Sequence, residues 1–227
     1  MILLHVRHWL KRHLSPPWRY FMTRKQAPLS ASFGYDRGQP IDRYYIEKFL
    51  HEHRSAIRGR CLEVADDGYT KKFDNGVIQS DVLDLDTRNA NATIHGDLRH
   101  LDSIADNIYD CVILTQVLQF IDDLPAAVRE VHRILKPGGV LLATLPCVSP
   151  IDTESGCARD HWRFTEASTE YLFWPVFGKE HTIIETHGNC YAGLAFWIGM
   201  SREELTQEQL AYHDPKFPCL IIVKAVK

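Results

Sequence analysis

The chain has 227 residues, 45% of them hydrophobic, which suits one α/β domain with an ordinary core rather than a disordered chain or two full domains. Its formal net charge of -3 and pI of about 6.4 give no sign of the basic excess that nucleic-acid binding needs. No apolar run reaches the roughly 18 residues of a membrane-spanning helix.

We expect residues 1–39 to form a basic N-terminal extension with a lid loop, ahead of one domain over residues 40–227. The opening MILLHVRHWLKRHL is a poor signal peptide, because basic residues interrupt it and no small-residue cleavage site follows. It is either a basic amphipathic helix on an anionic membrane or an extra helix packed on the domain. Six cysteines without CxxC spacing favour a reducing compartment, so we expect a cytoplasmic protein, with membrane-peripheral contact as the alternative.

Strands and helices then alternate. A helix is expected over 41–57 after Pro40, and a capped helix over 122–136 that ends at Pro137-Gly138-Gly139. Strands are expected at 61–64, 76–80, 92–95, 109–115, 139–145, 181–186 and 219–227, with helices near 194–200 and 203–213. This alternation predicts parallel βαβ units in a doubly wound α/β sheet. We expect seven strands, mostly parallel, with the closing segment 219–227 as an antiparallel last strand.

Three carboxylates follow successive strands in this scheme. Glu63 closes the first strand, Asp81 follows the second and Asp97 follows the third. In an open α/β sheet, ligands bind outside the carboxyl ends of the strands, and an acid roughly 20 residues after the first turn accepts ribose hydroxyls. An acid after the third strand can accept from an exocyclic amine such as that of adenine. Together they favour a nucleoside site over solvated loop ends.

This arrangement resembles the class I S-adenosylmethionine-dependent methyltransferases over roughly residues 40–147. The matching segments are LEVADDGYTKKF, IQSDVLDLD, GDLRHLDSIADNIYDCVILTQVLQFI and VHRILKPGGVLLATLP. The turn that is usually G-x-G-x-G has Ala65, Asp67 and Tyr69 at its glycine positions, and Gly68 is its only glycine. Glycine lets the backbone approach the cofactor closely.

The resemblance implies S-adenosylmethionine as the cofactor. The residues expected to bind it are Arg37, Arg43, Tyr44, Glu63, Ala65, Asp67, Asp81, Val82, Asp97, Leu98, Thr115 and Gln116. An arginine can bind the cofactor carboxylate bidentately, and a tyrosine ring can face the sulfonium. The alternative for Arg43 and Tyr44 is that they are the solvated and packing faces of a helix.

The segments around Arg37–Tyr45 and Trp162–Thr165 resemble methyltransferases of bacterial saccharide and glycan pathways. They imply O-methylation of a small sugar-like or secondary-metabolite acceptor. We expect His161 as the general base, because imidazole titrates near neutral pH, with Asp160 beside it. The alternative is that this stretch shapes the acceptor pocket without moving a proton. Mg²⁺ bound to Asp152, Asp160 and His161 is a secondary hypothesis.

Other hypotheses stay open. The altered turn favours a catalytically impaired binding module, and N- or C-methylation remains an alternative to O-methylation. A nucleotide-dependent oxidoreductase ranks last, because no G-x-G-x-x-G follows the first strand. A homo-oligomer is compatible with the sequence.

Overall fold

The computed structural model describes residues 2–14, 26–153 and 159–227, with side chains from Val6 onward. It forms two compact units. The sheet unit comprises Lys48–Pro146, Asp152–Glu185 and Ile221–Lys227, and the helical unit comprises Met1–Glu47, Cys147–Ile151 and Thr186–Leu220. The predicted boundary at residue 40 does not coincide with this division, and the one-domain organisation stays a prediction.

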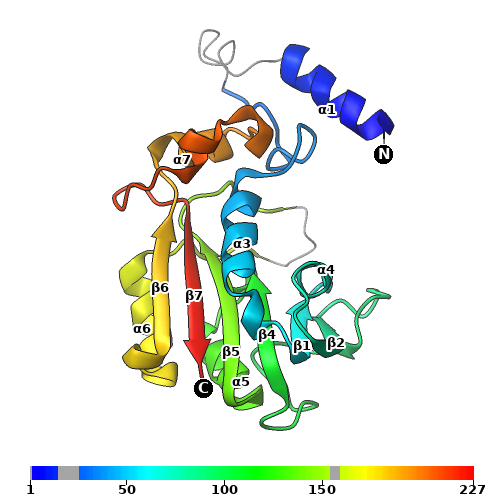
Figure 1. The fold of residues 1–227 in the computed structure, drawn as a ribbon, viewed down its shortest axis with the longest axis vertical. Helices are drawn as coiled ribbons and strands as arrows, with labels where there is room; N and C mark the ends of the chain where they lie inside the picture. The colour runs from blue at the N-terminus through cyan, green and yellow to red at the C-terminus, as the bar shows by residue number, and fades with distance from the viewer. Residues whose placement is uncertain (1, 15–25, 154–158) are drawn as a thin grey trace. The chain divides into compact units, whose positions relative to one another are not determined.

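A seven-stranded sheet carries the fold, in the order β3-β2-β1-β4-β5-β7-β6 (Figure 1). The strands are β1 (Gly59–Val64), β2 (Val77–Asp84), β3 (Ile94–His95), β4 (Tyr109–Thr115), β5 (Leu135–Pro146), β6 (Thr182–His187) and β7 (Leu220–Val226). β3, β2, β1, β4 and β5 are parallel neighbours. The apolar centres of β4 and β5 are buried, as expected for strands covered on both faces. This confirms the predicted α/β class and doubly wound sheet.

The last strand is antiparallel, as predicted. Gly138 and Gly139, near the start of β5, exchange backbone hydrogen bonds with Lys227 at the chain end, at 2.7 and 3.0 Å. The opposite directions of β6 and β7 can be followed in Figure 1. β7 lies between β5 and β6. The chain therefore forms the edge strand β6 first and then adds β7 between it and β5.

The predicted capped helix before β5 is confirmed. α5 (Leu124–Ile134) begins after Asp123, whose side chain accepts from the Ala126 nitrogen, and it buries its apolar stripe. The predicted stop at Pro137-Gly138-Gly139 was wrong, because β5 already starts at Leu135. Gly138 has φ +78°, and a Cβ on Gly139 would lie 2.8 Å from the Lys136 carbonyl oxygen. The glycines therefore form an irregular strand entry rather than a helix stop.

One helix of the sheet unit was not predicted from the sequence. α6 (Glu166–Phe177) begins with a capping box, in which Thr165 and Ser168 each bond the other's backbone nitrogen. Its end packs on α5, where the Phe177 and His132 rings lie 5.0 Å apart. The sheet unit also contains the short helix α4 (Gly68–Lys72). The signal that could have found α6 is the cap at Thr165, which closes the Trp162–Thr165 segment.

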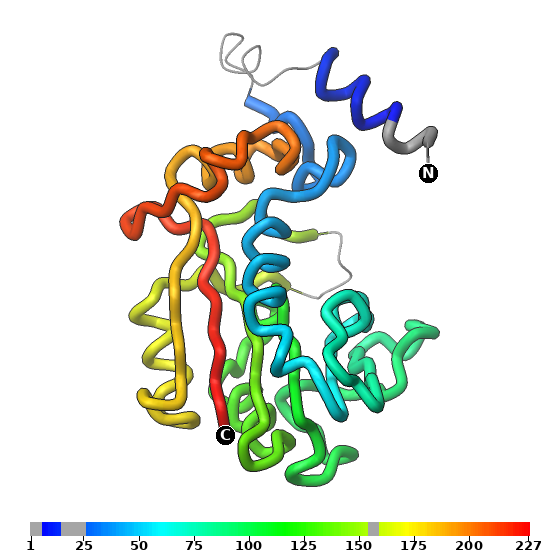
Figure 2. Tube along the Cα trace, in the orientation of Figure 1, coloured from blue at the N-terminus to red at the C-terminus, as the bar shows by residue number. Residues whose placement is uncertain are grey.

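The helical unit contains α1 (Ile2–Leu14), α7 (Cys190–Trp197) and α8 (Gln207–Ala211). Thr206 caps α8, because its side chain accepts from the Gln209 nitrogen. α3 (Ile41–Glu52) starts in this unit, continues into the sheet unit and ends earlier than the predicted residue 57. Figure 2 lets the chain be followed by colour through both units.

No helix in the described ranges is long and apolar enough to cross a membrane. Among the described cysteines, Cys61, Cys111, Cys147, Cys190 and Cys219 are all free thiols.

Candidate functional site

The carboxyl ends of β1, β2 and β3 meet at one edge of the sheet unit. Val64, the last residue of β1, pairs with Leu83, and Asp84, the last residue of β2, pairs with His95 of β3. The end of β2 is therefore held directly between the first turn and the end of β3. Parallel strands place their terminal side chains at one edge, where ligands bind in open α/β sheets.

The structure corrects the placement of Asp81 and Val82. β2 runs to Asp84, so both residues lie inside the strand rather than after it, and both are buried. The Asp81 carboxylate accepts from Arg60 Nε at 2.7 Å, from the Tyr109 hydroxyl at 3.0 Å and from Gln79 at 3.0 Å. The predicted strand ends at residue 80, four residues too early, because the polar Asp81 lies inside the strand rather than after it.

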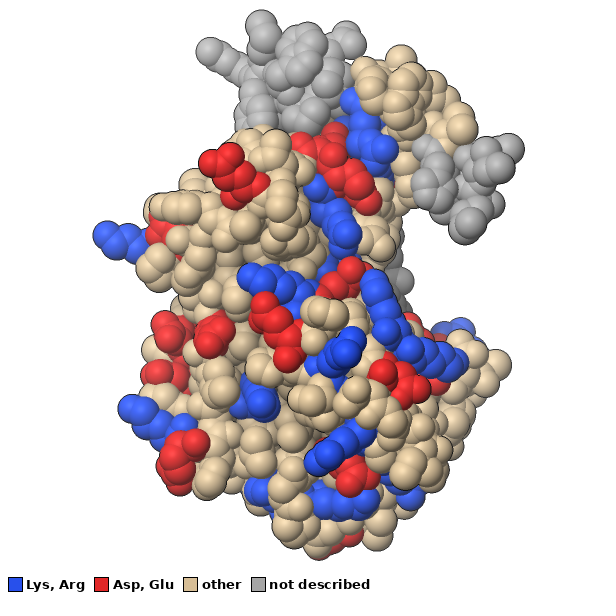
Figure 3. Space-filling model, in the orientation of Figure 1, with Lys and Arg blue, Asp and Glu red and all other residues tan. Residues whose placement is uncertain are grey.

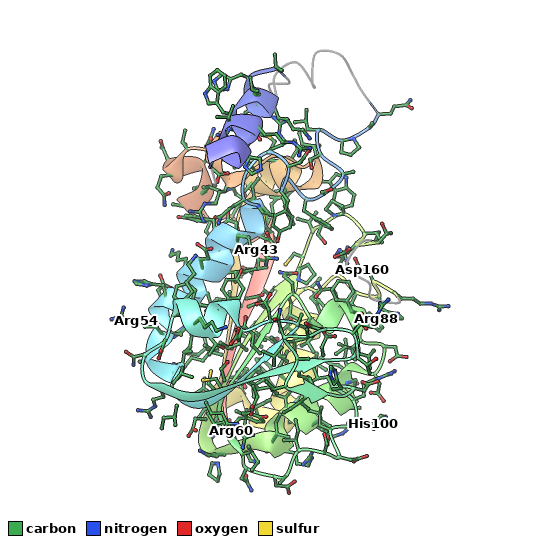
Figure 4. The ribbon with its side chains drawn as sticks, turned by 90° about the vertical axis from the view of Figure 1, so that its right-hand side faces the viewer. Arg43, Arg54, Arg60, Arg88, His100 and Asp160 are labelled. Carbon is green, nitrogen blue, oxygen red and sulfur yellow. The ribbon has the colours of Figure 1, made fainter. Side chains whose placement is uncertain are left out.

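The partners of Asp81 point toward the opposite end of the strands. Arg60 is the second residue of β1, and in Figure 4 it lies at the far end of the sheet unit from Asp160. Burial and the neighbouring Asp81 charge both raise the pKa of Tyr109, so its hydroxyl stays protonated and donates. Asp81 therefore completes an internal hydrogen-bond network.

Asp84 is the acid at the carboxyl end of β2. It is partly exposed and accepts from Asn89 Nδ2 at 2.6 Å and from the Asp86 nitrogen at 2.8 Å. The same Asn89 nitrogen donates to the Ala65 carbonyl at 2.7 Å, which joins Asp84 to the first turn. The signal for Asp84 was in the DVLDLD run, where the second acid, not the first, terminates the strand.

The first turn has the backbone that a glycine would normally supply. Ala65 follows β1 with φ +71°, in the left-handed region, and its nitrogen donates to the Leu83 carbonyl at 2.9 Å. It is exposed, so the small methyl group leaves the turn open. Ala65 thus adopts a backbone conformation that glycine favours, at a cost of about 1 kcal/mol.

Tyr69 does not crowd this turn with its ring. It lies in α4, and its ring stacks on Phe73 at 6.3 Å between centroids. Asp67 precedes α4 without a side-chain capping bond, and its carboxylate pairs with Lys71 at 2.8 Å. The loss of glycines from the turn is therefore accommodated by a helical turn that directs the large side chain along α4.

Glu63 stabilises the first turn through hydrogen bonds to the start of α4. Its buried carboxylate accepts from the Tyr69 nitrogen at 3.2 Å and from the Thr70 nitrogen and hydroxyl at 2.8 Å each. Burial raises its pKa to about 7, although these three hydrogen bonds lower it. Glu63 therefore ties β1 to the start of α4 and titrates near neutral pH.

Asp97 follows β3, as predicted. Its carboxylate accepts from Arg99 Nη2 at 2.6 Å and from Arg99 Nε, and Arg99 also pairs with Asp122. Hydrogen bonds from Arg99 lower the pKa of Asp97, against a smaller opposing effect of burial, so the group is an anion at neutral pH. The neighbouring Leu98 is buried.

Thr115 and Gln116 lie at the carboxyl end of β4. Thr115 is the last residue of the strand, and Gln116 has φ +56° while its nitrogen donates to the Thr144 carbonyl at 3.1 Å. Both are partly exposed. The left-handed residue turns the chain sharply across the strand ends, toward the short 3₁₀ helix Leu118–Phe120.

The predicted acceptor segment returns to the same edge. The His161 nitrogen donates to the Gln119 carbonyl at 2.8 Å, and the Phe164 nitrogen donates to the Pro146 carbonyl at 2.8 Å. Trp162 Nε1 donates to the Ile121 carbonyl at 2.8 Å, yet the side chain remains 41% exposed. The structure thus brings His161 and Trp162 to the ends of β4 and β5, with the His161 side chain in solvent.

Asp160 has another role in the structure. Its side chain accepts from Arg163 at 2.6 and 2.8 Å and from the Asp152 nitrogen at 3.0 Å. Burial favours a higher pKa, but these hydrogen bonds outweigh it and lower the pKa of Asp160. A paired anion of this kind is a weak proton acceptor. The geometry therefore supports a role for Asp160 in positioning the segment that carries His161 rather than in proton transfer.

The remaining predicted residues belong to the helical unit. Arg37 is buried and donates to Glu204 at 2.9 and 2.6 Å, so its guanidinium already holds a carboxylate of the protein. Arg43 donates to the Tyr35 hydroxyl at 2.9 Å, and the Tyr44 hydroxyl accepts from Gln207 at 2.6 Å. Their binding to a cofactor stays a prediction.

Within the described part of the chain, no group of three His, Cys, Asp or Glu side chains is placed to hold a metal ion. The Mg²⁺ hypothesis therefore finds no support in Asp152, Asp160 and His161.

Part of the chain is similar to known proteins. Residues 72–143 match the family described as "Methyltransferase domain". A probable polyketide synthase 5 of Dictyostelium discoideum is 29% identical over 137 residues, which are 57% of this chain and 5% of that protein. The chain thus spans a small part of the curated relative that it matches.

Two solved structures share the fold. A SAM-dependent methyltransferase from Archaeoglobus fulgidus superposes with a TM-score of 0.54 at 14% identity, covering 82% of this chain and 94% of that one. A SAM-dependent methyltransferase, possible histamine N-methyltransferase, from Thermotoga maritima gives 0.54 at 15% identity, covering 97% and 99%. The chain therefore shares the fold of these S-adenosylmethionine-dependent methyltransferases.

Proposed function

We propose that the chain binds S-adenosylmethionine at the carboxyl ends of β1, β2 and β3 and transfers its methyl group to a hydroxyl of a small sugar-like acceptor. The observation that carries the cofactor part is the alignment of Ala65, Asp84 and Asp97 on three adjacent strand ends. An exposed left-handed turn beside two carboxylates fits a nucleoside with a polar tail.

The roles within this site follow from the side chains. Asp84, rather than Asp81, accepts the ribose hydroxyls, and the exposed Leu85 beside it offers an apolar surface to the adenine ring. Asp97 accepts from the adenine amine, with the backbone of Leu98 beside it. Thr115 and Gln116 border the site at the end of β4.

The reaction is an in-line displacement at carbon. S-adenosylmethionine supplies an activated methyl group whose C–S bond breaks as the acceptor oxygen forms the new C–O bond. The acceptor hydroxyl loses its proton to His161, which the Gln119 carbonyl holds at the end of β4 through the His161 backbone. Asp160 and Arg163 fix the segment that carries it, which contributes orientation rather than proton transfer.

The acceptor class rests on Trp162 and on the resemblance of its segment to saccharide methyltransferases. The indole is fixed by its Nε1 hydrogen bond while part of its surface faces solvent, so it can stack on the apolar face of a sugar. The similarity to part of a probable polyketide synthase supports a polyketide-like hydroxyl as a second acceptor class.

Calorimetric titration with S-adenosylmethionine and S-adenosylhomocysteine tests the cofactor part. Micromolar binding of both supports the proposal, and no binding to either contradicts it. The acceptor part is tested by methyl transfer to a panel of glycosides and polyketide alcohols. His161→Ala should leave cofactor affinity unchanged and lower kcat by a factor on the order of 100 to 10,000.

A catalytically impaired binding module is the second candidate, and the altered first turn favours it. Ala65, Asp67 and Tyr69 replace glycines that allow close approach to the cofactor. This candidate predicts weak or no binding of S-adenosylmethionine and no turnover on any acceptor, with or without His161→Ala.

A further inference from the structure

The helix α1 is attached to the helical unit by its polar side. The Lys11 ammonium pairs with the Asp36 carboxylate, and Arg12 Nη1 donates to the Arg37 carbonyl at 2.9 Å. Arg37 is itself buried and bonded through two nitrogens to Glu204, so the anchoring loop is firm. α1 is thus fastened through charged and polar contacts.

The apolar side of α1 is left in solvent. Val6, Leu10 and Leu14 repeat at four-residue spacing, with Trp9 beside them, and these side chains are 43–70% exposed. An amphipathic helix on a globular protein normally buries this stripe and exposes its charges. In Figure 3 the tan outer side of α1 contrasts with the blue and red atoms where it meets the following loop. The usual orientation is reversed here.

A second helix of the same unit has a similar surplus of exposed apolar surface. α7 has the sequence CYAGLAFW, without any charged residue. Ala192, Ala195 and Phe196 are buried, whereas Tyr191, Leu194 and Trp197 are 43–53% exposed. A helix that is apolar all round is normally buried on every side, in protein or in lipid.

The charge of α1 favours a negatively charged partner. The helix contains Arg7, Lys11 and Arg12 together with three histidines and no acidic residue. Basic residues flanking an exposed apolar stripe with tryptophan are the composition of helices that lie in the headgroup region of anionic bilayers. Tryptophan and tyrosine also concentrate at membrane–water interfaces.

We propose that the helical unit docks on an anionic lipid bilayer through the apolar side of α1 and the exposed side of α7. The apolar side chains enter the headgroup–acyl boundary while the exposed Arg7 meets the lipid phosphates. The proposal does not depend on methyl transfer, because none of these residues belongs to the candidate site in the sheet unit.

The test is flotation of the full chain with vesicles of phosphatidylcholine alone or mixed with phosphatidylglycerol. We expect co-flotation with the mixed vesicles, little with phosphatidylcholine alone, and a loss of binding as salt screens the charges. Leu10→Glu combined with Leu14→Glu should lower the partition coefficient at least about tenfold. Trp197→Ser should lower it by a smaller factor.

The matched control is Tyr171→Glu, which places an acid at an exposed aromatic position on α6 of the sheet unit and should bind vesicles like the unchanged chain. Circular dichroism and titration with S-adenosylmethionine verify that each variant is folded. Equal binding to both vesicle types, or unchanged binding of the double variant, overturns the proposal. Sedimentation velocity tests for a second copy of the chain as the partner. The proposal is overturned if the unchanged chain forms a dimer without binding vesicles and the double variant is a monomer.

Discussion

Asn89 Nδ2 lies 2.6 Å from the carboxylate of Asp84 and uses the same nitrogen to bond the Ala65 carbonyl at 2.7 Å. One amide thereby fixes the acid at the end of β2 to the left-handed turn after β1. This contact, which joins residues 24 positions apart in the chain, organises the edge of the sheet where we propose that the cofactor binds. It also separates the roles of two aspartates that the sequence places three residues apart.

Asp84→Asn should weaken S-adenosylmethionine binding by about 1–3 kcal/mol, because the amide cannot accept both ribose hydroxyls. Asp81→Asn should instead lower the free energy of unfolding, since it leaves Arg60 without its anion inside the sheet. Calorimetric titration and urea unfolding of both variants separate the effects. The reverse pattern, with Asp81→Asn abolishing affinity in a stable protein, would return the ribose role to Asp81.

Glu63 should make the stability of the protein depend on pH near neutrality. Its folded-state pKa of about 7 lies above its ordinary value, so the folded form binds the proton more tightly than the unfolded chain. Stability is therefore greatest below about pH 4.5 for this group and falls as pH rises through 7, by on the order of 1–3 kcal/mol.

Glu63→Gln removes this titration. Urea unfolding between pH 5 and pH 8 should show the unchanged chain losing stability relative to the variant as pH rises. Parallel profiles for the two proteins would show that Glu63 does not titrate in this range. Glu63→Asp, which keeps the charge, serves as the control for loss of the Thr70 hydrogen bonds.

Ala65→Gly should be neutral to stabilising by up to about 1 kcal/mol, because glycine relieves the left-handed strain but adds freedom to the unfolded chain. Ala65→Val should destabilise by more than that, since a β-branched residue fits φ +71° poorly. Thermal unfolding measures both. The glycine variant should also bind S-adenosylmethionine at least as tightly as the unchanged chain, and weaker binding would argue against close approach at this turn.

Arg37→Met or Glu204→Gln should each cost about 3–5 kcal/mol, because each leaves a partner charge buried. The two side chains are only 2% and 6% exposed, so solvent cannot replace the lost contact. Unfolding of both single variants and the double variant gives the coupling free energy. Stable single variants with lowered S-adenosylmethionine affinity for Arg37→Met alone would restore Arg37 as a cofactor ligand.

Asp160→Asn should destabilise the protein by about 2–3 kcal/mol, because the buried carboxylate holds Arg163 and the Asp152 nitrogen. His161→Ala should leave stability within about 0.5 kcal/mol, since its side chain is exposed. Differential scanning calorimetry of the two neighbouring variants compares a supporting residue with a candidate base. A large loss for His161→Ala would mark it as structural.

The sequence by itself determined the sheet. Apolar periodicity, caps and glycines act over a few residues, so the alternation of strands and helices and a helix cap at Asp122 or Asp123 could be predicted. It also determined that acids gather at the strand ends, because a strand leaves the core where its side chains become polar.

Only the tertiary structure decided which residues those ends present. β2 tolerates Asp81 in its interior because Arg60 and Tyr109, from two other strands, supply its hydrogen bonds, and no local pattern reveals such partners. Arg37 turned inward for the same reason, since Glu204 lies 167 residues away in the chain. Local patterns fix where a strand or helix forms, whereas the partners of a buried charge depend on which distant segments the fold brings together.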